Sequence, residues 1–160
     1  DKSPSGMKLR APCRKVSHHQ DVSRLAKDLS DTLKAARGLG LAAPQIGVPL
    51  KVCVVDAGSH HITMVNPEIR VFRDEFGKQI RGPQRITAEQ EECLSLPGYS
   101  AFLVRPPGVT VQYRTVEGAM VRQDLRGLAA RVACHEIDHL QAILIPDRLE
   151  AQNAMRQEAA

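Results

Sequence analysis

The chain has 160 residues, of which 42% are hydrophobic, and it carries a formal net charge of +4. Its apolar content is enough for a core, which excludes an intrinsically disordered chain, and its length predicts a single domain over residues 1–160. No run approaches the roughly 18 apolar residues of a membrane span, so no membrane partner is expected. The basic residues lack interleaved aromatic side chains, so sequence-specific nucleic-acid binding is not expected. The modest positive charge fits only weak attraction to an acidic surface such as a ribosome.

The first half of the chain predicts one helix, a small-residue segment and several strands. Residues 1–20 have no periodicity and are expected to be irregular. Apolar residues at helical spacing then predict a helix over 22–36, with Asp21 as its N-cap and Gly38 beyond its end. The segment Gly38–Gln45 lacks the Lys-Ser/Thr ending of a phosphate loop, so its glycines favour close approach of the backbone to another group.

Buried strands are expected over Lys51–Val55 and Ile62–Asn66, with a third over Glu68–Phe72. The polar stretch Arg73–Glu89 is interpreted as a mobile loop or an irregular hairpin.

The second half predicts a strand pair and then a helix. Apolar and polar residues alternate over Val109–Arg114, and Ala119–Leu125 is expected to return as the antiparallel partner. Gly127 opens a helix that ends near Leu140, and residues 147–160 form a tail or short helix. The order of helix, strands and helix indicates an α+β fold with antiparallel sheets packed around the second helix.

A metal-binding pattern lies in this second helix. His135 and His139 are four residues apart, so their rings project from one face about one turn apart. Two imidazoles at this spacing can bind one divalent ion, and Glu136 can reach a water on that ion. An accidental match on an amphipathic helix is the alternative. It is disfavoured because the apolar residues Leu128 and Val132 continue the same face.

A catalytic site of this kind needs a third protein ligand beside the water. The extended protease pattern would require Gly at position 142 and His at position 145, where the chain has Ala142 and Ile145. The downstream carboxylates Glu150 and Glu158 lie close to the end of the chain. Cys93 is the better candidate, because a deprotonated thiol binds divalent metals well.

Three segments, in this order and spacing, resemble the motifs of the peptide deformylase family: Gly38–Gln45, Glu91–Ser95 and His135–His139. The likeness extends to Met64–Ile69 and Gly127–Arg131. The resemblance implies a metal-binding helix packed among antiparallel sheets. It also implies an enzyme that removes the formyl group from formyl-methionine at the N-terminus of new polypeptides. The implied cofactor is one divalent ion, Fe²⁺ or its substitutes Zn²⁺, Ni²⁺ or Co²⁺.

The resemblance also implies roles for single residues. Three would ligate the ion: Cys93, His135 and His139. Glu136 would take a proton from the metal-bound water, whose pKa falls towards about 7 in zinc hydrolases, and pass it to the departing amine. The amide of Gln45 and the backbone N–H of Leu94 would stabilise charge on the formyl oxygen, and each such donor typically contributes about 2.7–4 kcal/mol.

Substrate recognition is implied at two places. The backbone around Leu39 and Gly40 would bind an extended peptide as an added strand. Leu128 and Val132 would line a pocket for the methionine side chain, although without the resemblance an ordinary core role is equally favoured.

The chain also departs from the family pattern at three positions. Glu92 stands where glycine is usual, Cys134 replaces a common glutamine and Ala142 replaces a glycine. A pairing of Glu91 with Arg105 beside the Cys93 loop is a further hypothesis from the resemblance.

Two other functions stay open: a metallopeptidase that uses the same helix, and a non-catalytic relative that binds metal or nascent chains. The four cysteines form no CxxC pair, which suggests a reducing compartment. Bacterial cytosol is therefore expected. A mitochondrion or plastid is the alternative, because the first twenty residues are basic and contain serine.

Overall fold

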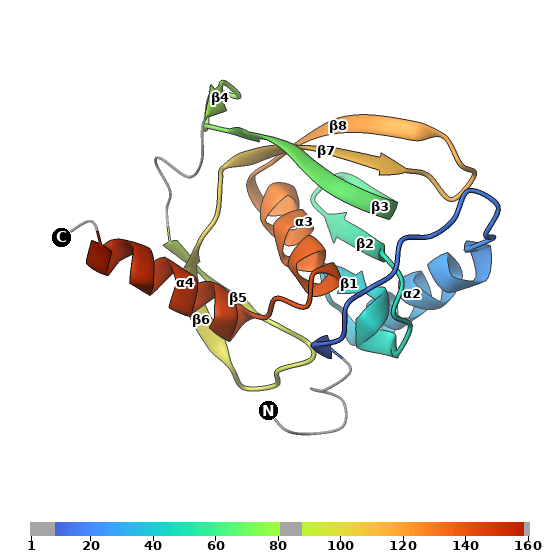
Figure 1. Ribbon diagram of the computed structural model, residues 1–160, viewed down its shortest axis with the longest axis horizontal. Coiled ribbons are helices and arrows are strands. Elements are labelled where there is room, and N and C mark those ends of the chain that lie inside the picture. Colours follow the sequence, from blue (N-terminus) through green and yellow to red (C-terminus); the bar gives the residue numbers. More distant parts are fainter. Residues whose placement is uncertain (1–8, 81–87, 159–160) are drawn as a thin grey trace.

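A computed structural model describes residues 9–80 and 88–158 of the chain. Figure 1 shows helix α3 (Gly127–Leu140) near the centre, with strands curving around it and the helices α2 and α4 on opposite sides. Antiparallel sheets together with helices make the architecture α+β, as the sequence indicated.

The N-terminal helix α2 spans Ser23–Ala36 and confirms the predicted helix. Its apolar stripe buries Leu29 and Leu33 against the sheet. The predicted cap is corrected by one position: Val22 is the N-cap, while Asp21 accepts a hydrogen bond from the Ser23 N–H at 2.8 Å.

One antiparallel sheet forms most of the fold, in the order β1-β2-β3-β7-β8, with β4 paired to β3. Its strands are β1 (Gly40–Ala42), β2 (Val52–Ala57), β3 (His60–Arg73), β4 (Gln79–Ile80), β7 (Gly108–Arg114) and β8 (Met120–Arg126). A short 3-10 helix, η1 (Ala43–Ile46), follows β1. Since β1 lies at the end of the strand order, one of its edges has no strand partner in the described part of the chain.

Strand β3 corrects the prediction of two separate strands. It runs without a break from His60 to Arg73, and its register with β7 shifts between Val65 and Glu68, where Pro67 sits. A bulge accommodates a proline within a sheet, because the ring removes one ladder hydrogen bond. Asn66 at this bulge adopts φ 51°.

The stretch predicted as a mobile loop or an irregular hairpin, Arg73–Glu89, contains strand β4, which pairs with β3 as a hairpin, and the start of β5. Residues 81–87 of this stretch lie outside the described residues. The hairpin of β5 (Ala88–Glu92) and β6 (Ser100–Val104) was not predicted from the sequence. This pair forms a second, separate two-stranded sheet. Its connecting loop carries Cys93.

The strand pair β7–β8 and helix α3 confirm the predictions for the second half. Helix α4 spans Ile145–Glu158, so it begins two residues before the predicted terminal helix. The main core lies where α3 packs on the sheet, and Ile145 of α4 joins Leu103 of β6 in a smaller cluster. None of the helices in the described ranges has the length and apolarity to cross a membrane.

Candidate metal centre

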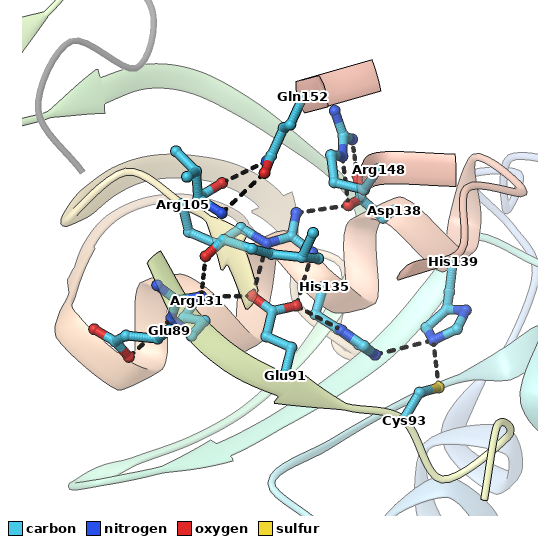
Figure 2. Close-up of polar contacts among 12 residues, drawn as sticks. Glu89, Glu91, Cys93, Arg105, Arg131, His135, Asp138, His139, Arg148 and Gln152 are labelled. Carbon is cyan, nitrogen blue, oxygen red and sulfur yellow. Dashed lines mark hydrogen bonds and ion pairs between the residues drawn. The ribbon is translucent and has the colours of Figure 1, made fainter. Parts of the chain in front are cut away.

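Helix α3 and the loop after β5 bring the three proposed ligands together. The donor atoms of Cys93, His135 and His139 all lie within 4.8 Å of one another, and no other such group occurs in residues 9–80 and 88–158. His139 Nε2 is 3.2 Å from the Cys93 Sγ and 3.1 Å from His135 Nε2. Figure 2 shows the two rings and the sulfur converging from the helix and the loop.

This donor set fits a divalent ion. Thiolate and imidazole are preferred ligands of Zn²⁺ and similar metals. Burial lowers the pKa of His139 to about 3, so this ring stays neutral and keeps a lone pair for an ion. His135 behaves differently: burial alone would lower its pKa, but hydrogen bonds with Cys93 and Glu91 raise it to about 10. Protein without metal therefore keeps a proton on His135, which a bound ion replaces.

Two buried polar atoms of α3 have no hydrogen-bond partner among the described residues: Glu136 Oε2 and His139 Nδ1. Leaving such an atom unpaired costs about 1–3 kcal/mol, so an unpaired carboxylate beside the ligands points to a ligand or water there. Burial raises the pKa of Glu136 to about 7, against the lowering effect of His135.

Gly40 of β1 lies directly against this carboxylate. A Cβ atom at Gly40 would come within 2.4 Å of Glu136 Oε1 and 2.6 Å of Val132 Cγ1. Contacts this short are not tolerated, so only glycine lets the backbone of β1 approach α3 here. The close approach that the small-residue segment predicted is confirmed.

The amide of Gln45, in η1, is held between β1 and the Cys93 loop. Its Oε1 accepts a hydrogen bond from the Ala42 N–H at 2.8 Å. Its Nε2 donates to Ser95 Oγ at 3.0 Å and lies 3.8 Å from Cys93 Sγ. Because the oxygen is engaged by the backbone, the donor end of the amide is directed towards the metal centre. Leu94 follows Cys93 in this loop and its side chain is half-exposed.

A buried ion-pair network contacts His135 at Nδ1, the ring nitrogen that faces away from the other proposed ligands. Glu91 accepts hydrogen bonds from Arg105 at 2.9 and 3.0 Å, which confirms the predicted pair, and lies 3.2 Å from His135 Nδ1. Burial opposes ionisation of Glu91, but the hydrogen bonds with His135 and Arg105 lower its pKa to about 2. A carboxylate at Nδ1 fixes the ring orientation and turns Nε2 towards the other ligands.

The network continues into α4 through contacts that were not predicted from the sequence. Asp138 of α3 accepts hydrogen bonds from Arg105 at 2.6 Å and from the Arg148 Nε at 3.1 Å. Gln152 forms two hydrogen bonds with the backbone of Val104, at 3.0 and 2.8 Å (Figure 2). No sequence signal identifies these partners, because α4 has no apolar periodicity and Gln152 lies 48 positions from Val104.

A groove of about 900 Å³ opens onto the centre. It is lined by Leu39 and Gly40 and, on α3, by Leu128 and Val132 beside His135 and Glu136. Leu39 and Leu128 are about half-exposed, at 47% and 49%, whereas Val132 is buried. Apolar side chains that remain open to solvent beside a polar centre are typical of a ligand-binding groove.

The remaining cysteines and Ala142 lie outside the donor group. Cys13, Cys53 and Cys134 are buried free thiols, and burial raises the pKa of Cys134 to about 12. Ala142, just after α3, adopts φ 61°, a left-handed conformation that glycine tolerates better.

The model of the polypeptide deformylase family matches residues 3–155. The chain belongs to this family. It is 41% identical to the peptide deformylase of Thermomicrobium roseum over 146 residues, which cover 86% of this chain and 77% of the relative. It is 35% identical to that of Picosynechococcus, with coverages of 92% and 76%.

Solved structures of deformylases share the fold. The Thermotoga maritima enzyme superposes with a TM-score of 0.77 at 31% identity, covering 88% of this chain and 90% of that one. The Acinetobacter baumannii enzyme bound to Met-Ala-Ser gives 0.76 at 28% identity, covering 88% and 91%. The chain is thus a peptide deformylase, which removes the N-formyl group from newly made polypeptides. The family implies a divalent metal for this reaction.

Proposed function

We propose that Cys93, His135 and His139 hold the catalytic ion, with Fe²⁺ as the native metal and Zn²⁺, Ni²⁺ or Co²⁺ as substitutes. The convergence of the three donor atoms within 4.8 Å carries this proposal. A bound divalent ion supplies Lewis acidity and lowers the pKa of a water ligand.

Glu136 acts as the proton carrier. Its carboxylate takes a proton from the water that attacks the formyl carbon, and donates it to the amine nitrogen as the carbon–nitrogen bond breaks. Formate and a free N-terminus are the products. The unpaired Oε2 of Glu136, buried next to His135, supports this assignment.

Gln45 and Leu94 stabilise the oxygen of the formyl group as it becomes negatively charged. The Ala42 N–H orients the Gln45 amide, so its Nε2 faces the Cys93 loop and can donate to this oxygen in place of its long contact with Cys93 Sγ. The backbone N–H of Leu94 has no acceptor among the described residues and is adjacent to the ligand Cys93. Preorganised donors of this kind act most strongly where charge develops in the transition state.

The peptide binds along the free edge of β1. An extended chain there adds a strand through the backbone of Leu39 and Gly40, which both line the groove. The side chain of its formyl-methionine enters the apolar floor formed by Leu128 and Val132. The Met-Ala-Ser ligand of the Acinetobacter baumannii enzyme is a peptide of the same kind.

A formyl-Met-Ala-Ser assay tests this function. A deformylase releases formate, a metallopeptidase releases shorter peptides, and a non-catalytic binder releases neither. Glu136→Gln should keep the bound metal, measured by elemental analysis of anaerobically purified protein, but lose turnover. Undiminished formate release by this variant would refute the proton-carrier role.

The proposed setting is the bacterial cytosol, with transient association of the enzyme with ribosomes that present formylated nascent chains. The net charge of +4 and the bacterial relatives support it. Co-sedimentation of the protein with purified ribosomes at low salt, lost at high salt, is the expected result, and its absence at low salt would contradict the association.

A further inference from the structure

Glu92, at the end of β5, places a carboxylate on the side of the groove that the β5–β6 hairpin lines. Side chains alternate along β5, so the buried Glu91 points towards Arg105 while Glu92 points to the opposite face. Gln90 shares this outer face, and Ser100 is the cross-strand neighbour of Glu92. All three outer-face residues line the groove, so this face of the hairpin forms its wall.

The carboxylate of Glu92 is not engaged by another side chain in the described part of the chain. Within the described ranges, Glu92 takes part in no hydrogen bond or ion pair through its side chain, whereas the neighbouring Gln90 donates to Ser100 Oγ at 3.0 Å. The other carboxylates that line the groove differ, since Glu91 is paired with Arg105 and Glu136 is buried. Glu92 is thus the exposed negative charge that a bound peptide meets on this wall.

The position of Glu92 fixes which part of a peptide it meets. It directly precedes Cys93, so its Cα lies about 3.8 Å from that of the proposed ligand. The formyl group reacts at the metal centre, and an extended peptide advances about 3.3 Å per residue from there. The residues that follow the methionine therefore pass beside Glu92.

We propose that Glu92 makes this deformylase select formylated peptides with Lys or Arg at the second or third position over peptides with Asp or Glu there. This inference rests on the proposed function, because it assumes that the peptide lies in the groove with its formyl group at the Cys93 centre. A glycine at position 92, the residue that is usual in the family, would offer no such charge.

The effect has a defined size and origin. An exposed ion pair changes binding by about two- to fivefold, and salt screens it. Because the charge lies away from the breaking bond, it acts on the peptide in ground state and transition state alike, and changes KM rather than kcat.

The test compares kcat/KM for formyl-Met-Lys-Ser, formyl-Met-Glu-Ser and the matching pair with the charge at the third position, using the metal-loaded full chain. The wild-type enzyme should prefer the Lys peptide by about two- to fivefold in at least one pair, less so in 0.5 M NaCl than in 0.05 M. Glu92→Gln should abolish the preference and Glu92→Lys should invert it.

Glu117→Gln is the matched control, because it removes the same charge from the exposed turn between β7 and β8, outside the groove. It should keep the wild-type preference. Formate release with no preference in either pair, or an equal loss of preference in both Gln variants, would overturn the role of Glu92. Failure to release formate from any peptide would instead refute the proposed function, so the two failures are distinguishable.

Discussion

The two regions that provide the proposed metal ligands are built in different ways. Helix α3 lies in the main core, where residues such as Ala130, Ala133 and Ile137 pack against the sheet. The β5–β6 hairpin that precedes Cys93 is a separate two-stranded sheet, and within β5 only Glu91 is buried. A pair of strands is marginally stable alone, so the hairpin depends on contacts from α3 and α4. One part of the site is fixed by the main core, and the other by polar contacts together with the small apolar cluster around Leu103 and Ile145.

The largest expected effect comes from breaking the ion-pair network that joins the two regions. Arg105→Met leaves Glu91 and Asp138 buried without this partner, and breaking a buried pair costs about 3–5 kcal/mol. Urea denaturation should show this loss in the free energy of unfolding. Arg70→Met is the control, because its pair with Glu68 is exposed and contributes at most about 1 kcal/mol. Equal losses in both variants would contradict the network's role.

The second-largest effect is expected from removing the metal ion. With free metal at about 100 times its dissociation constant, the ion stabilises the folded state by about 2.7 kcal/mol, so a chelator should lower Tm. Hydrogen exchange should then rise more at the β5–β6 hairpin than in α3, because the hairpin has fewer buried contacts. An equal rise in both regions would show that the hairpin is as firmly held as the helix.

Loosening the hairpin from α4 should have a smaller effect. Gln152→Ala removes two hydrogen bonds to the backbone of Val104 and should cost about 1–2 kcal/mol. Exchange of the Val104 amide, followed by NMR, should rise with it. Gln157→Ala in the same helix removes an exposed amide and should change neither measurement. An equal rise in the exchange of the Val104 amide in this variant would contradict a specific role for Gln152.

The smallest expected effect is a gain of stability on the α3 side. Ala142→Gly relieves a left-handed backbone conformation and should raise the free energy of unfolding by up to about 1 kcal/mol. The control, Ala151→Gly, lies in an exposed position of α4 and should lower it by about 1 kcal/mol. A loss of stability in Ala142→Gly would show that the strain is not significant.

The same contrast explains what could be predicted from sequence. Helix α3 and its histidines follow from local periodicity and spacing, which depend only on neighbouring residues. The β5 segment reads Ala-Glu-Gln-Glu-Glu, without apolar alternation, because its inward residue is a carboxylate paired with Arg105. Its strand character therefore depends on a distant partner that no local pattern contains.

Strand β3 was predicted as two separate strands for a related reason. Asn66-Pro67 is a typical turn signal, but the Asn66 amide bonds both the N–H and the C=O of Val16, at 2.8 and 2.9 Å, fifty positions away. This tertiary contact fixes the bulge at Asn66, and the strand continues beyond it. Cys93 was proposed as a ligand by elimination and by its motif, whereas Arg148 and Gln152 could be found only from the fold.

Gly40 has a consequence for how this enzyme can diverge. A single missing side chain lets β1 touch the Glu136 carboxylate of α3, so a side chain at this position would displace both elements from each other. Outward side chains on the β5–β6 hairpin, such as that of Glu92, have no such steric restriction, so the hairpin side of the groove can change its chemistry without moving β1 from α3.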